Sequence, residues 1–124
     1  MRSVVIASLL LSLAVGASAQ ITAETTADAE KLKQACDGGE AKSCFDLGNR
    51  YREGEGVAKD LAKAAQLYQK ACEAGHAGSC FNLANRYREG EGVAKDLVKA
   101  AQLYQQACDE GEARACEVVR QLRE

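Results

Sequence analysis

Proline and tryptophan are absent from this chain of 124 residues, and histidine occurs once, at His76. Proline interrupts helices, so its absence leaves long segments free to be helical, and the abundant Ala, Leu, Glu, Lys and Gln favour that state. One histidine cannot complete a zinc site, and the chain lacks any Cys-x-x-Cys pair. We therefore predict an all-α protein with no bound metal and no cofactor.

An excess of charge of one sign is also lacking. The chain has 16 Lys and Arg against 18 Asp and Glu, which gives a net charge of −2. A mixed and mildly acidic surface argues against nucleic acid or an anionic membrane as the main partner. We therefore expect neither nucleic acid nor a membrane as a partner of the mature protein.

Beyond its N-terminus the sequence lacks long apolar runs. The first residues, "MRS", are basic, and they are followed by the apolar run "VVIASLLLSLAVGA" and the small residues "ASA". This order is typical of a secretory signal peptide that is cleaved between Ala19 and Gln20. The apolar run is too short for a permanent membrane helix. We predict that residues 1–19 are removed and that residues 20–124 form one secreted or periplasmic domain.

Six cysteines form three pairs with the same spacing, in "ACDGGEAKSC", "ACEAGHAGSC" and "ACDEGEARAC". An even number of cysteines in an exported chain of this size is typical of disulfides. Each pair flanks a turn between two expected helices, so a bridge would hold one structural unit to the next. Closing such a loop contributes roughly 2.5 kcal/mol in the chain-entropy model. The predicted disulfides are Cys36–Cys44, Cys72–Cys80 and Cys108–Cys116.

Residues 36–71 and 72–107 differ at only 8 of 36 aligned positions, so the chain contains an internal repeat. Repeats of about this length form arrays of short units that bury their apolar faces against one another. In each unit two segments of helical periodicity flank "EGEGVAKD", whose glycines end the first helix and whose aspartate caps the second. We expect helices at about 24–37, 41–53, 60–73, 77–89, 96–109 and 113–123, with 24–35 and 113–123 as polar caps of the array.

The expected core faces combine apolar and small side chains. In the first unit they consist of Cys44, Leu47, Gly48, Tyr51, Leu61, Ala64, Ala65, Tyr68, Ala71 and Cys72. In the second unit they consist of Cys80, Leu83, Ala84, Tyr87, Leu97, Ala100, Ala101, Tyr104, Ala107 and Cys108. His76, in the turn between the units, is expected to be exposed.

The segment "CFDLGNRYREGEGVAKDLAKAAQLYQKAC" and its copy resemble the Sel-one-like repeat, a relative of the tetratricopeptide repeat. The matching residues of the first copy are Leu47, Gly48, Tyr51, Gly54, Gly56, Val57, Asp60, Lys63, Ala64, Tyr68 and Ala71. The second copy matches equally, except that Ala84 replaces the first glycine. The resemblance implies a right-handed α/α superhelix of antiparallel helix hairpins, a scaffold that binds a protein or peptide partner on its concave face.

The cysteine spacing beside a signal peptide also resembles the Hcp family of secreted cysteine-rich proteins, which carry a β-lactamase label. This resemblance implies an alternative function, penicillin binding or weak β-lactam hydrolysis, with a β-lactam or peptidoglycan-like ligand. The serines after residue 19 are Ser43 and Ser79, and neither has the lysine of an S-x-x-K motif. Any hydrolysis would have to use Asp46 or Glu53 beside Arg50. We therefore expect a scaffold rather than an enzyme, with the catalytic residues of the alternative unknown.

The polar face of the first helix in each unit is the candidate binding site. Stacked units would present its side chains as a ladder that grips an extended peptide through hydrogen bonds. The alternative is a solvated face whose side chains pair with one another along the helix. The residues are Asp46, Asn49, Arg50, Glu53, Asn82, Asn85, Arg86 and Glu89.

Overall fold

The computed structural model describes residues 23–124, and the predicted signal peptide with its cleavage site at Ala19–Gln20 lies outside this range. The described residues form six helices and no strand. The helices are α2 (Ala23–Asp37), α3 (Ala41–Glu53), α4 (Leu61–Glu73), α5 (Ala77–Glu89), α6 (Leu97–Asp109) and α7 (Ala113–Leu122). Every expected helix boundary lies within one residue of the observed one, so the all-α prediction is confirmed.

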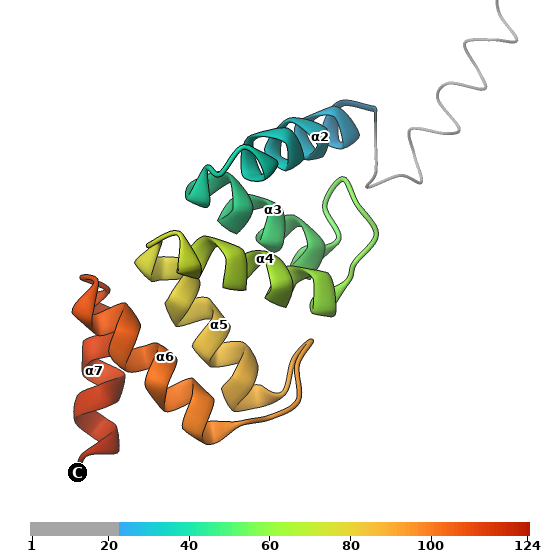
Figure 1. The fold of residues 1–124 in the computed structure, drawn as a ribbon. Coiled ribbons are helices and arrows are strands. Elements are labelled where there is room, and N and C mark those ends of the chain that lie inside the picture. Colours follow the sequence, from blue (N-terminus) through green and yellow to red (C-terminus); the bar gives the residue numbers. More distant parts are fainter. Residues whose placement is uncertain (1–22) are drawn as a thin grey trace, which may run out of the picture.

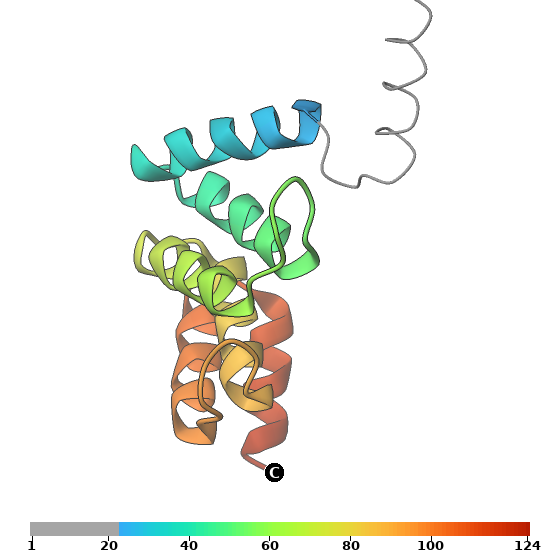
Figure 2. The same ribbon diagram turned by 90° about the vertical axis from the view of Figure 1, so that its right-hand side faces the viewer.

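The helices stack in chain order from α2 at one end to α7 at the other (Figure 1). Each helix packs on the helices before and after it in the chain. A view turned by 90° shows that the helix directions change progressively, from α2 lying across the stack to α6 and α7 running along it (Figure 2). The chain is thus a curved stack of antiparallel helix hairpins.

Aspartates and glycines set the ends of the helices. The Asp60 carboxylate accepts a hydrogen bond from the backbone N–H of Lys63 at 3.0 Å. Asp96 accepts the same bond from Lys99 at 2.9 Å. Each bond satisfies a backbone donor that the first helical turn would otherwise leave unpaired. Gly54 ends α3 in the left-handed region, with φ of 72°. The predicted caps and glycine stops are confirmed.

Two tyrosines are the largest fully buried side chains, Tyr68 on α4 and Tyr104 on α6. Their hydroxyls donate hydrogen bonds to asparagines of the preceding helices, Tyr68 to Asn49 at 2.5 Å and Tyr104 to Asn85. Burial raises the pKa of both hydroxyls, so they stay protonated and act as donors. The surrounding core consists of Ala64, Ala65, Leu83, Ala84, Ala100, Leu103, Ala107, Ala115 and Val119.

The second unit departs from the predicted core at the start of α6. Leu97 is 59% exposed and Ala101 is also exposed, so placing both in the core was wrong. In the first unit the equivalent Leu61 is partly buried, and the loop after α5 packs on the start of α4: a Cβ at Gly92 would lie 2.1 Å from the Leu61 carbonyl oxygen. Within residues 23–124 no loop packs on the start of α6 in this way. Burial therefore depends on the next unit as well as on the repeat pattern.

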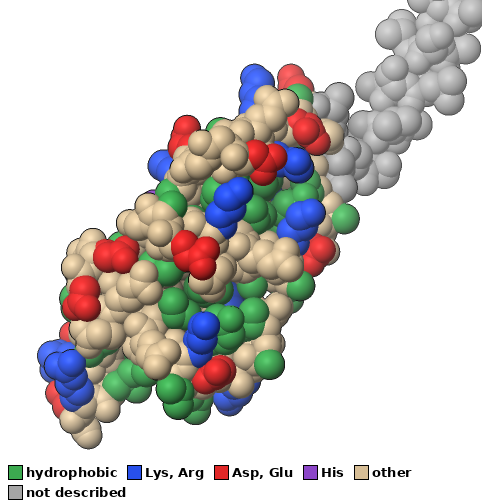
Figure 3. Space-filling model, in the orientation of Figure 1, with side chains coloured by type: hydrophobic (Ala, Val, Ile, Leu, Met, Phe, Trp, Pro, Cys, Tyr) green, Lys and Arg blue, Asp and Glu red, His purple; other side chains and the backbone are tan. Residues whose placement is uncertain are grey.

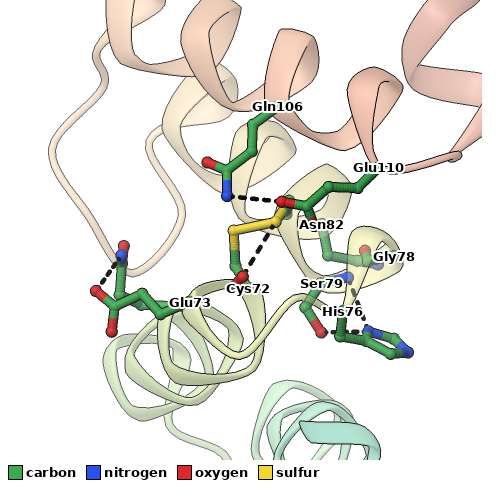
Figure 4. Close-up of a disulfide and its surroundings, with 10 residues drawn as sticks. Cys72, Glu73, His76, Gly78, Ser79, Asn82, Gln106 and Glu110 are labelled. Atoms are coloured by element: carbon green, nitrogen blue, oxygen red, sulfur yellow. Dashed lines mark hydrogen bonds between the residues drawn. A yellow bond between two sulfur atoms is a disulfide. The ribbon is translucent and has the colours of Figure 1, made fainter.

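Three disulfides join the hairpins at their turns: Cys36–Cys44, Cys72–Cys80 and Cys108–Cys116, each with Cα atoms 4.6 Å apart. Figure 4 shows the second bridge, which links the last turn of α4 to the first turn of α5. The three bridges tie α2 to α3, α4 to α5 and α6 to α7. None of the helices in residues 23–124 has the length and apolar character needed to cross a membrane.

Candidate functional site

A cleft of about 610 Å³ lies between α2 and α3. We call it the α2–α3 cleft. Its lining residues are Asp28, Lys31, Leu32, Ala35, Ser43, Asp46, Asn49, Arg50, Glu53 and Glu55. The cleft therefore brings together the four candidate binding residues of the first copy. It also includes four residues of α2, which the sequence pattern had indicated only as a polar cap.

The α2–α3 cleft carries charges of both signs with an acidic excess. Its cations are Lys31 and Arg50, and its anions are Asp28, Asp46, Glu53 and Glu55. Asp46 pairs with Lys42 of its own helix at 3.2 Å. Leu32 and Ala35 add apolar surface to the same cleft. Apolar surface with charged groups beside it suits an amphipathic polypeptide.

The same face of the second copy is closed. Arg86 is only 4% exposed, and its guanidinium donates a hydrogen bond to Glu91 at 2.9 Å. Asn82 donates to the Gly78 carbonyl oxygen at 3.0 Å, and Asn85 accepts from the Tyr104 hydroxyl as Asn49 does from Tyr68 in the first copy. Arg86 thus belongs to the interior, and including it in an open ladder requires correction. Glu89 remains exposed.

Helix α3 is what closes that face. At one end of α5, the Phe45 ring of α3 lies 4.8 Å from the His76 ring. At the other end, Glu91 lines a common depression with Arg52 and Glu53, where α3 ends. α3 therefore spans the groove between α4 and α5. No helix within residues 23–124 spans the equivalent groove between α2 and α3, which is why the first copy keeps an open cleft.

His76 is partly buried, so the expectation of an exposed histidine was wrong. Its Nδ1 accepts the backbone N–H of Ser79 at 3.1 Å and lies 2.7 Å from the Ser79 hydroxyl oxygen. Figure 4 shows the imidazole beside Ser79 at the turn that the second disulfide closes. His76 is thus the N-cap of α5. Its place just before a predicted helix start was the signal that could have identified this role.

The serines are not placed for nucleophilic chemistry. Ser43 and Ser79 are both buried, and the Ser43 hydroxyl donates to Glu40 at 2.5 Å. The Ser79–His76 contact has the distance of a nucleophile–base pair, but Ser79 is 0% exposed and a substrate cannot reach it. No group of three or more His, Cys, Asp or Glu side chains in the described part of the chain is arranged to hold a metal ion.

The repeat units match a known family model. The model of the Sel1 repeat matches residues 41–76 and residues 77–112. The chain belongs to the Sel1 repeat family. The matched units are the α3–α4 hairpin and the α5–α6 hairpin, so α7 occupies the place of the first helix of a further Sel1 unit. α2 likewise occupies the place of the second helix of a preceding unit.

Three solved structures are similar to this Sel1 chain. A Sel1 repeat protein of Oxalobacter formigenes is 31% identical with a TM-score of 0.74, over 76% of this chain and 39% of that one. Cysteine-rich protein B of Helicobacter pylori is 36% identical with a TM-score of 0.71, over 73% of this chain and 68% of its own. A protective antigen of uropathogenic Escherichia coli strains, which displays an SLR fold, is 31% identical with a TM-score of 0.69, over 71% of this chain and 19% of that one.

These likenesses confirm the predicted right-handed α/α superhelix of Sel1 hairpins. The chain spans about two fifths of the length of the Oxalobacter formigenes protein. A search of curated protein sequences gave no significant match. Sel1 repeats generally form scaffolds for protein–protein interaction, and the disulfides together with the likeness to cysteine-rich protein B indicate an extracytoplasmic protein.

Proposed function

We propose that this Sel1 repeat protein is an exported scaffold that binds a protein or peptide partner in the α2–α3 cleft. One observation carries the proposal: α2 and α3 bring charged, amide and apolar side chains together in a single open cleft of about 610 Å³. Arg86, the counterpart of Arg50 in the second copy, is buried and bonded to Glu91. We therefore place the binding site on the first copy alone, instead of on a row of side chains that extends over both copies.

Recognition in this cleft is by non-covalent contact. Arg50 can donate bidentate hydrogen bonds to a carboxylate or to backbone carbonyl oxygens of the partner. Asp28 and Glu53 can pair with basic side chains, while Leu32 gives an apolar contact. A partner with both basic and apolar residues on one side therefore fits best.

Export to the periplasm or the external medium is part of the proposal. The three disulfides need an oxidising compartment to form and persist. The N-terminal sequence supplies the signal peptide that such export requires. We expect mass spectrometry of the protein from its own cells to find Gln20 as the first residue and all six cysteines oxidised.

The 36% identity to cysteine-rich protein B reflects the shared Sel1 repeats and gives no support to the Hcp alternative, with its β-lactam or peptidoglycan-like ligand. Neither serine of the described residues can act as the nucleophile of such a hydrolysis, because both are buried. We therefore propose the scaffold function in preference to penicillin binding.

The test is capture of partners from the extracytoplasmic fraction of the native cells. We expect Arg50→Ala to reduce the captured partner at least about tenfold, because a charge-assisted bidentate contact is lost. Arg88→Ala is the matched control, since Arg88 is exposed on α5 outside the cleft. Equal capture by the wild type and the Arg50→Ala variant would rule out the cleft as the binding site.

A further inference from the structure

The groove between α4 and α5 shows what the α2–α3 cleft is shaped to receive. α3 lies in that groove, with its Phe45 ring 5.9 Å from the Tyr68 ring of α4. Gly48 of α3 approaches so closely that a Cβ there would lie 2.8 Å from the Tyr68 ring and 3.4 Å from the Ala64 carbonyl oxygen. Phe45 and Leu67 also pack against one common cluster of buried side chains. The groove is therefore a docking surface for the first helix of a Sel1 unit.

The α2–α3 cleft is the same groove one repeat earlier. With the repeat of 36 residues, Asp28 takes the place of Ala64, Lys31 that of Leu67, and Leu32 that of Tyr68. All three line the cleft. The cleft is therefore shaped for a helix, with two apolar contacts of the internal groove replaced by a carboxylate and an ammonium group.

Helix α7 carries the complementary charges. It is the equivalent of α3 two repeats later, so Arg120 takes the place of Gly48 and Glu117 that of Phe45. Both side chains are exposed, and they pair with each other at 2.5 Å. If α7 docks as α3 does, Arg120 lies beside Leu32 and the backbone of Asp28, within reach of the Asp28 carboxylate, and Glu117 lies on the side of α2 that carries Lys31. Both contacts then join charges of opposite sign.

We propose that the α2–α3 cleft of one copy receives α7 of a second copy, so that copies associate head to tail and continue the superhelix. This inference rests on the proposed function, because it names the partner of the same cleft. The contact is heterologous, with different surfaces on the two copies, so association does not stop at a symmetric dimer and grows with concentration. Because the complementary groups are charged, salt weakens it.

Sedimentation velocity of the purified mature protein, residues 20–124, tests the proposal. We expect the average mass of the wild type to rise with concentration at low salt and to fall when salt is added. Asp28→Lys and Arg120→Glu should each weaken association at least about tenfold, because each places like charges opposite one another. Lys95→Glu is the matched control, since Lys95 is an exposed cation in the loop before α6.

Mixing the two variants gives the decisive result. The Asp28→Lys copy keeps Arg120, which can pair with Asp28 of the Arg120→Glu copy. The glutamate introduced in the second variant can pair with the lysine introduced in the first. An equal mixture should therefore regain association. Circular dichroism of each variant verifies that the helices are intact.

A wild type that stays monomeric at the highest concentration, or a mixture that does not associate, overturns the head-to-tail contact. If Arg50→Ala still abolishes partner capture in that case, the cleft binds another protein and only this inference fails. If neither effect is found, the proposed function fails as well.

Discussion

The two Sel1 units, residues 41–76 and 77–112, differ at 8 of 36 positions, yet they place identical side chains in different surroundings. Arg50 lines an open cleft, whereas Arg86 is buried and bonded to Glu91. Leu61 is partly buried, at the start of the helix on which the Gly92 loop packs, whereas Leu97 is 59% exposed. In such an array the neighbouring unit decides whether a side chain is core or surface.

The comparison also separates two roles for one helix face. In the second unit, α3 covers that face, Arg86 bonds to Glu91, and Asn85 bonds to Tyr104 of the core. In the first unit the same face is left open: Asn49 bonds to Tyr68 as Asn85 does to Tyr104, but Arg50 and Glu53 line the α2–α3 cleft. A binding site thus arises where the repeat pattern is interrupted: Asn49, Arg50 and Glu53 are the same in both copies, whereas α2 supplies Asp28 and Lys31 in place of apolar residues. Both units share the mixed surface of Figure 3, on which acidic and basic side chains are interspersed.

The largest expected effect comes from breaking the contact between the two units at Gly92. A Cβ at this position would lie 2.1 Å from the Leu61 carbonyl oxygen, and the φ of 76° is unfavourable for any other residue. We expect Gly92→Ala to lower the free energy of unfolding by about 3 kcal/mol, measured by urea denaturation.

Gly111→Ala is the matched control for this change. Gly111 also has a positive φ, 104°, but no atom lies within 4 Å of the added Cβ. Only the backbone cost remains there, about 1 kcal/mol. Equal losses in the two variants would contradict the proposed close packing of the Gly92 loop on α4.

A smaller effect should distinguish the two arginines. Arg86→Ala removes a buried guanidinium and leaves the Glu91 carboxylate, which is partly exposed, without its ion pair. We expect a loss of about 2 kcal/mol, below the usual cost for a fully buried pair because water reaches Glu91. Arg50→Ala should change the free energy of unfolding by less than about 0.5 kcal/mol, as is usual for surface positions. Thermal or urea unfolding of both variants gives the difference, and equal losses would mean that Arg50 is also part of the core.

The helices and the second unit's closed face illustrate what sequence reasoning can and cannot reach. Asp60 and Gly54 act through local backbone geometry, so their positions predicted the helix ends to within one residue. Arg50 and Arg86 stand in the same local sequence, "NRYREGEG", so no local signal could show which of them is open. That difference depends on a helix at a distance along the chain.

The contribution of α2 to the cleft was missed for a related reason. Asp28 and Lys31 interrupt the apolar pattern of the equivalent helix, which predicted a solvated cap. The two residues can be recognised as part of a binding surface only when the position of α3 beside α2 is known. His76 stands just before a helix start, which is a local signal for an N-cap, so its role was within reach of the sequence.

The smallest expected effect is a pH dependence at the last junction, where Glu112 takes the place that His76 holds between the units. The Arg114 guanidinium, which donates to the Glu112 carboxylate at 2.8 Å, lowers the pKa of Glu112 below its ordinary value of 4.5. A carboxyl group whose pKa is lower in the folded state stabilises the fold above its unfolded pKa, and this stabilisation is lost as the pH falls through the folded pKa. Because Arg114 is largely exposed, solvent limits the gain to about 0.5 kcal/mol.

We expect Glu112→Gln to lower the free energy of unfolding by about that amount at neutral pH and to have no effect near about pH 2, where the wild-type carboxyl is protonated as well. Urea denaturation at the two pH values measures the difference. An equal loss at both would show that Glu112 acts through packing or through its hydrogen bond to the Arg114 backbone, and that its charge is not the cause.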